Sequence, residues 1–162
     1  MIEVEIPGGA VLAIENVVLD MNGTLAVDGK LLEGVAERVR LLAERVQVTV
    51  LTADTHGGAR HLEKELGVRT VVLKRGDSPK PAPEDQQKAD FVGSLGAKHT
   101  AAVGNGTNDA RMLQECALGI CVVGREGAAA ATLAAADVVV CDVRDALDLL
   151  LKPIRLVATL RR

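Results

Sequence analysis

The stretch that decides the fold is residues 17–24, Val17-Val18-Leu19-Asp20-Met21-Asn22-Gly23-Thr24. An apolar, largely β-branched run ends abruptly on a carboxylate, which predicts a buried strand with Asp20 at its carboxyl end. In open α/β sheets, ligands bind at that edge. Because Gly23 tolerates backbone angles that other residues avoid, the chain can turn away and leave Asp20 accessible. The stretch therefore predicts a functional carboxylate at the edge of a sheet.

Similar apolar runs follow along the chain and alternate with segments of helical periodicity. The expected strands are residues 3–6, 11–14, 17–19, 46–51, 70–73, 100–103, 119–123 and 138–141. The expected helices are residues 33–44, 55–66, 84–95, 110–117, 127–135 and 142–151, residues 154–160 are helical or extended, and the proline-containing residues 74–85 form a loop. This alternation predicts an α/β, Rossmann-like, doubly wound and mainly parallel sheet. We expect one domain over residues 1–162.

The composition excludes two classes of partner. The chain has a single Phe, no Tyr and no Trp, so it lacks aromatic platforms for stacking bases, and its net charge is -3. We therefore expect no nucleic-acid partner. The longest apolar tract, residues 128–140, carries Thr132 and Asp137 and is too short and polar to span a bilayer. We therefore expect no membrane partner either.

The cysteines and the first residues bear on localisation. The chain has three cysteines, Cys116, Cys121 and Cys141, without the CxxC spacing of a zinc site or the even number of a disulfide framework. Their apolar neighbours predict buried thiols in a reducing compartment. Residues 1–6 alternate apolar residues with Glu and do not resemble a signal peptide. These features predict a cytoplasmic protein.

Polar side chains follow the expected strands at their carboxyl ends. Asp20 follows one strand, Thr52 the next, and Asn105 and Asp109 follow the strand at residues 100–103, while Lys88 lies on the helix before it. Carboxylates can hold Mg²⁺, and an ammonium and a hydroxyl can offset phosphate charge while a carboxylate oxygen attacks in line. Backbone N–H groups after Asp20 would bind phosphate oxygens. The set predicts phosphoryl transfer.

Four motifs in this order resemble those of the haloacid dehalogenase (HAD) superfamily. They are Asp20-Met21-Asn22-Gly23-Thr24-Leu25, Leu51-Thr52, Gln86-Gln87-Lys88-Ala89-Asp90 and Gly104-Asn105-Gly106-Thr107-Asn108-Asp109-Ala110. The last motif is most similar to the catalytic domain of P-type ATPases. Each motif is weak alone, but the four in order at strand ends are specific.

The resemblance implies a Mg²⁺-dependent phosphatase that forms an aspartyl-phosphate on Asp20. The catalytic residues would be Asp20, Asn22, Thr52 and Lys88. The phosphate site would comprise Met21, Asn22, Thr52, Ala53 and Lys88. The metal site would comprise Asp20, the Asn22 carbonyl, Asn105 and Asp109. P-type transport is not implied, because the nucleotide-binding domain and membrane helices of those pumps are absent from this sequence.

Two positions depart from the family pattern. Asn22 replaces the second Asp of the first motif, which HAD phosphatases use as general acid and base, and losing such a group costs ~10²–10⁴-fold in rate. Asn105 replaces the Asp that usually begins the fourth motif, which removes one negative charge from the metal site. We therefore expect slow hydrolysis of a small phosphorylated molecule. The alternative is a non-catalytic or phospho-accepting binding or regulatory module that retains the pocket.

Each site residue also has an ordinary structural interpretation. Asp20 could belong to a turn, and Thr52 could cap a helix. Lys88 could be a solvated helix lysine. Asp109 could cap the helix that begins at Ala110, a role that is compatible with metal binding.

The spacing of the motifs leaves little room for a cap domain. Asp28-Gly29 between apolar pairs predicts a tight hairpin, a small flap beside Asp20. The gaps between the first three motifs are otherwise too short for an inserted domain. We therefore expect a capless, open site, and a homo-oligomer would be one way to cover it.

Overall fold

Six parallel strands form one sheet in the part of the chain that the computed structural model describes, residues 1–9, 11–53, 58–76 and 79–161. They are β3 (Asn16–Asp20), β6 (Gln47–Thr52), β7 (Arg69–Val72), β8 (Thr100–Gly104), β9 (Leu118–Val122) and β10 (Val138–Val140). The strand order is β10-β9-β8-β3-β6-β7. The chain adds strands first on one side of β3 and then on the other, so the sheet is doubly wound with its switch point at β3 and β8. The predicted fold class is confirmed.

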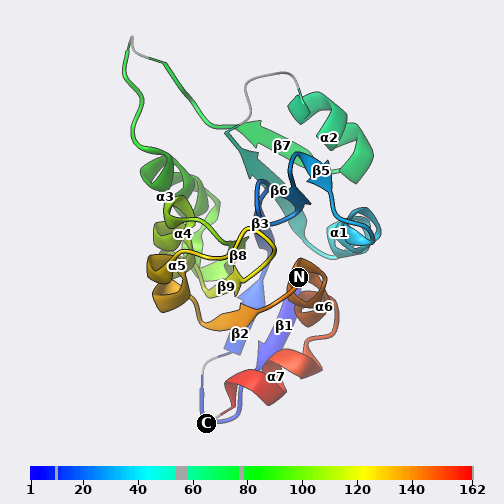
Figure 1. Ribbon diagram of the computed structural model, residues 1–162. Coiled ribbons are helices and arrows are strands. Elements are labelled where there is room, and N and C mark those ends of the chain that lie inside the picture. Colours follow the sequence, from blue (N-terminus) through cyan, green and yellow to red (C-terminus); the bar gives the residue numbers. More distant parts are fainter. Residues whose placement is uncertain (10, 54–57, 77–78, 162) are drawn as a thin grey trace.

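Helices cover both faces of the sheet (Figure 1). They are α1 (Val35–Ala43), α2 (Gly58–Leu66), α3 (Glu84–Leu95), α4 (Ala110–Glu115), α5 (Ala130–Ala135), α6 (Val143–Leu151) and α7 (Ile154–Leu160). Alternate residues of β3 point to opposite faces. Val17 and Leu19 pack into a core with α1 and α6, whereas Val18 packs with α3 and α4. Because both faces are buried, residues 17–19 of β3 are apolar, and the strand ends on Asp20.

Two hairpins lie outside this sheet. β1 (Ile2–Glu5) and β2 (Val11–Ile14) pair with each other, beside α7. β4 (Ala26–Val27) and β5 (Lys30–Leu31) form the predicted flap. Its two turn residues, Asp28 and Gly29, have φ values of 51° and 74°, the left-handed conformation that the tightest hairpin turns require.

The observed strands of the parallel sheet begin and end within one residue of the predicted ones. The helix expected at residues 127–135 begins three residues later, because the Gly127 N–H closes a turn onto the Gly124 carbonyl and Gly127 has a φ of 77°. The predicted start of the helix at 55–66 lies outside the described residues, which resume at Gly58 within α2.

The cysteine prediction was wrong for one residue. Cys121 is buried and Cys116 is half-buried, but Cys141 is exposed because it follows the edge strand β10. No helix within the described ranges is long and apolar enough to cross a membrane.

Candidate active site

Strand register places the predicted residues at one edge of the sheet. Asp20 ends β3 and pairs with Leu51 of β6, so Thr52, which is buried, lies one residue beyond that pair. On the other side of β3, Leu19 pairs with Val103 of β8. The fourth motif leaves β8 directly after this pair. The first, second and fourth motifs, which lie far apart in the sequence, therefore meet at the switch point of the sheet.

Lys88 connects two carboxylates at this edge. Its Nζ donates to Asp20 Oδ1 at 2.6 Å and to Asp109 Oδ1 at 2.6 Å. The Lys88 side chain is 1% exposed, and those of Asp20 and Asp109 are 9% and 0% exposed. Lys88 is therefore not the solvated helix lysine of the alternative interpretation. Three charged side chains from β3, α3 and the fourth motif meet in a buried cluster.

Asp109 is held by the backbone of its own motif. Its Oδ2 accepts hydrogen bonds from the N–H groups of Asn105 and Gly106, both at 2.9 Å. Gly104 makes room for it, because a Cβ there would lie 2.5 Å from the Asp109 carboxyl carbon. Asp109 does precede α4, but its side chain makes no capping hydrogen bond to that helix, so the capping prediction was wrong. The side chain is used within the motif and on Lys88 instead.

Thr24 links Asp20 to Asn105. Its Oγ1 lies 3.0 Å from Asp20 Oδ2 and 3.1 Å from Asn105 Oδ1, and the single hydroxyl proton is shared between these two acceptors. Asn105 Nδ2 donates to the Gly127 carbonyl at 3.1 Å. The amide is therefore oriented with its oxygen towards the Asp20 side of the site.

Burial and neighbouring charges shift the pKa values of Asp20 and Lys88. Burial raises the pKa of Asp20 to about 6, Asp109 acts in the same direction, and Lys88 opposes both. Burial by itself would lower the pKa of Lys88, but attraction to Asp20 and Asp109 outweighs it and the pKa is raised. Lys88 is therefore fully protonated at neutral pH, while Asp20 is ionised at a cost in free energy.

The remaining predicted residues lie beside this cluster and make fewer contacts with it. The Asn22 side chain is exposed, and its residue forms an isolated bridge with Ala26 at the base of the flap. Met21 is half-buried, and its carbonyl accepts from the N–H groups of residues 24–26. Ala53 follows Thr52 and is half-buried. The phosphate-binding role of Met21, Asn22, Thr52 and Ala53 remains a prediction.

The donor atoms fit a magnesium ion. Asp20 Oδ2 and Asn105 Oδ1 converge within 3.1 Å of one hydroxyl oxygen, and the Asn22 carbonyl belongs to the same turn. Among the described residues no group of three or more His, Cys, Asp or Glu side chains could hold a metal ion. Mg²⁺ needs only one or two carboxylates, because water and substrate phosphate complete its octahedron. The oxygens of Asp109, like those of Asp20, accept hydrogen bonds and keep further lone pairs, and Asp109 stays a predicted metal ligand.

One part of the site carries no recognised motif. Residues 124–127 form a turn after β9, closed by the Gly127 N–H on the Gly124 carbonyl at 3.0 Å. Glu126 Oε1 in this turn accepts from the Asp28 N–H of the flap at 3.3 Å. The turn therefore joins the flap to Asn105. Apart from two glycines in an alanine-rich region, no sequence pattern predicts this turn.

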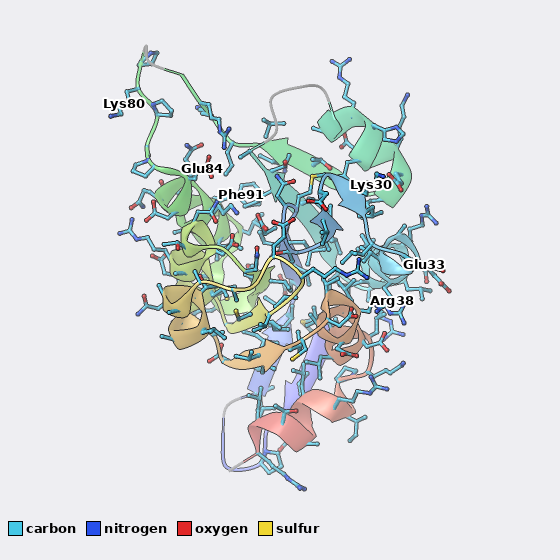
Figure 2. The ribbon with its side chains drawn as sticks, in the orientation of Figure 1. Lys30, Glu33, Arg38, Lys80, Glu84 and Phe91 are labelled. Carbon is cyan, nitrogen blue, oxygen red and sulfur yellow. The ribbon has the colours of Figure 1, made fainter. Side chains whose placement is uncertain are left out.

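One hollow of the molecule is not lined by the carboxylates Asp20 and Asp109. It has a volume of about 820 Å³ and opens between β7, residues 73–75 and 79–82, and α3, with Lys80 and Phe91 in its lining. Figure 2 shows Lys80, Glu84 and Phe91 on this side of the molecule and Lys30 of the flap on the side of α1.

Glu84 Oε2 accepts from Asn108 Nδ2 at 2.9 Å, so the start of α3 is fixed to the fourth motif. This bond sets the position of the helix that carries Lys88.

Comparison with known proteins identifies relatives of the chain. No protein-family model matches it. The uncharacterised protein MJ0073 of Methanocaldococcus jannaschii is 53% identical over 64 residues, which cover 40% of this chain and 69% of MJ0073. A second uncharacterised protein from the same organism, MJ0072, is 54% identical over 39 residues, 24% of this chain and 89% of MJ0072. The chain belongs to the family of these two proteins.

Solved structures identify the fold. The cobalt-bound deoxy-D-mannose-octulosonate 8-phosphate phosphatase of Haemophilus influenzae is similar with a TM-score of 0.67 and 19% identity, over 86% of this chain and 88% of that one. The 3-deoxy-D-manno-octulosonate 8-phosphate phosphatase of Moraxella catarrhalis, solved with a magnesium ion, a phosphate ion and a KDO molecule, has a TM-score of 0.66 and 19% identity, over 91% of this chain and 94% of that one. The chain therefore shares the fold of these phosphatases.

Transport ATPases show a partial sequence similarity. The cadmium/zinc-transporting ATPase HMA2 of Arabidopsis thaliana is 29% identical over 134 residues, which are 81% of this chain and 13% of the pump. The chain therefore corresponds to a small part of such a pump.

Proposed function

We propose that this chain is a Mg²⁺-dependent phosphohydrolase that acts on a small phosphate ester through an aspartyl-phosphate on Asp20. The observation that carries the proposal is the buried cluster in which Lys88 lies 2.6 Å from both Asp20 and Asp109. Burying ionised groups costs free energy that a pair of apolar side chains would not. A buried cluster with more negative than positive charge, at the ligand-binding edge of a sheet, points to function.

In the proposed first step, an oxygen of Asp20 forms a bond to phosphorus while the ester P–O bond breaks. Lys88 and Thr52 bind the phosphoryl oxygens, and Asp109 keeps the Lys88 ammonium in place. Mg²⁺, when bound by Asp20, Asp109, Asn105 and the Asn22 carbonyl, would offset charge on the transferring phosphoryl group. The leaving oxygen must take up a proton, which an amide such as Asn22 cannot provide near neutral pH, so we propose that solvent supplies it.

The second step, attack of water on the aspartyl-phosphate, needs a proton acceptor. Asn22 is exposed, and its amide cannot deprotonate the attacking water. We therefore propose slow turnover. The same observation favours a second candidate, a phospho-accepting or non-catalytic binding and regulatory module. The intact cluster of Asp20, Lys88 and Asp109 favours the enzyme.

The similar solved structures support a small phosphorylated substrate, since two of them are sugar-acid phosphate phosphatases. We also propose that residues 1–162 act as one cytoplasmic domain, without nucleic acid or membrane as partner. Homo-oligomerisation is proposed as a means of covering the open edge, since the flap hairpin β4–β5 is too small to enclose it.

The test is Mg²⁺-dependent release of phosphate from an aryl phosphate by the wild type, Asp20→Asn and Asn22→Asp. We expect slow release by the wild type, none by Asp20→Asn, and release ~10²–10⁴-fold faster by Asn22→Asp because a carboxylate restores proton transfer. The intact mass of each sample is measured as a control, because deamidation of Asn22 in the wild type would produce the same carboxylate as the Asn22→Asp substitution. Turnover by Asn22→Asp alone would favour the binding module, and turnover by none would contradict the proposal for simple esters.

A further inference from the structure

Glu126 and Asn105 converge on the same glycine next to Asp20. A Cβ added to Gly23 would lie 2.5 Å from Asn105 Nδ2 and 3.0 Å from Glu126 Oε2. Gly23 is buried and follows Asn22, whose carbonyl is a proposed metal ligand. The carboxylate of Glu126 therefore lies directly over the turn that carries two of the proposed ligands.

The two oxygens of Glu126 have different surroundings. Oε1 accepts from the Asp28 N–H of the flap at 3.3 Å, and Oε2 faces Gly23. The turn that carries Glu126 is fixed to Asn105 at two points. Asn105 Nδ2 donates to the Gly127 carbonyl at 3.1 Å, and the Ala129 N–H donates to the Asn105 carbonyl at 2.9 Å. These bonds fix the backbone of the turn beside Asn105, and the Glu126 side chain that extends from it is exposed.

The charge balance of the cluster suggests what Glu126 contributes. The two carboxylates of the buried cluster share one ammonium, which leaves a single net negative charge for a divalent cation. Asn105, a proposed ligand, contributes an amide oxygen and no charge. Among the described residues no three His, Cys, Asp or Glu side chains form a group that could ligate an ion directly. A carboxylate beside Asn105 would therefore stabilise the cation through one of its water molecules, as outer carboxylates do in many metal sites.

We propose that Glu126 belongs to the divalent-cation site and supplies, beside Asn105, the negative charge that this amide lacks. The inference rests on the proposed function only in assuming that a divalent cation binds at Asp20. A purely structural role, in which Glu126 ties the flap to the turn through Asp28, makes a different prediction. Glu126→Gln keeps an oxygen for the Asp28 N–H and removes only the charge.

The test measures Mn²⁺ binding by electron paramagnetic resonance, without substrate, in the whole chain. We expect Glu126→Gln to weaken Mn²⁺ binding by about 10- to 100-fold, the usual cost of losing an outer-shell partner. Asn105→Asp in the Glu126→Gln background should restore most of that affinity, because it returns a negative charge to the cation site. Glu115→Gln, at the exposed carboxyl end of α4, is the matched control and should bind as the wild type does. Circular dichroism of each variant confirms that it is folded.

Unchanged Mn²⁺ affinity of Glu126→Gln would overturn the inference, and so would a loss that Asn105→Asp does not restore. Absence of Mn²⁺ binding by the wild type would overturn both the inference and the metal dependence of the proposed function. If the wild type binds Mn²⁺ with the expected variant pattern but hydrolyses no ester, the inference stands and only the phosphatase proposal fails.

Discussion

Asp20 is ionised in a place that disfavours its charge. It is nearly fully buried beside Asp109, and the single ammonium of Lys88 serves both carboxylates. Folding therefore costs more with Asp20 charged than with Asp20 neutral. Buried charges that destabilise the fold in this way are expected at functional sites, because activity often requires groups that lower stability.

We predict that Asp20→Asn stabilises the cation-free protein at neutral pH, by on the order of 3 kcal/mol. The pKa of Asp20 is raised from 3.8 to about 6, so the folded state binds this proton more tightly than the unfolded state does. Stability from Asp20 therefore falls as the pH rises from about 4 to about 6, and stays low above that range. The Asn variant removes the charge but keeps an oxygen for Thr24.

The measurement is denaturant unfolding, followed by circular dichroism in the presence of a chelator, at several pH values. The advantage of Asp20→Asn should shrink as the pH falls from 6 towards 4, because wild-type Asp20 becomes protonated there. A variant less stable than the wild type at neutral pH would contradict this description of the cluster.

At the level of elements, close packing of helices on the sheet positions the site. β9 carries Gly119 against α4, and a Cβ at Gly119 would lie 2.5 Å from the carbonyl oxygen of Leu113. Since α4 follows the fourth motif directly, its distance from β9 influences where Asp109 lies. The glycine is required by this approach, because the neighbouring atoms are backbone and cannot rotate away.

We predict that Gly119→Ala destabilises the fold by about 1–3 kcal/mol, the usual cost of overpacking. The control is Gly93→Ala on α3, where an added Cβ meets no atom within 4 Å. That change should stabilise the protein by about 0.4–1 kcal/mol, since alanine restricts the unfolded chain. Thermal unfolding of both variants is the measurement. Equal effects of the two substitutions would show that the approach of α4 to β9 is not constrained.

The elements were largely predictable from the sequence, for a local reason. Buried parallel strands are apolar runs bounded by polar residues, and the pattern located the strands of the sheet and the flap turn at Asp28-Gly29. The turn at residues 124–127 was not predictable, because an alanine-rich segment also favours helix and only Gly127 marks its end. Glu126 consequently carried no signal. Its place beside Gly23 results from the packing of loops that lie far apart in sequence.

For the molecule as a whole, the switch point of the sheet brings together predicted site residues that lie far apart in the sequence. β3 and β8 lie side by side, although about 80 residues separate them in sequence, so the first and fourth motifs meet without an added domain. The flap of β4 and β5 and the turn at 124–127 border the site in place of a cap (Figure 1).

The central claim is that Asp20 accepts a phosphoryl group. It is tested most directly by incubating the wild type with Mg²⁺ and an aryl phosphate, quenching in acid, and measuring intact and peptide masses. We predict one phosphoryl group on Asp20, absent from Asp20→Asn and shorter-lived in Asn22→Asp, because the restored carboxylate activates the attacking water. Phosphate release without any phosphorylated Asp20, or a phosphoryl group on another residue, would contradict the account.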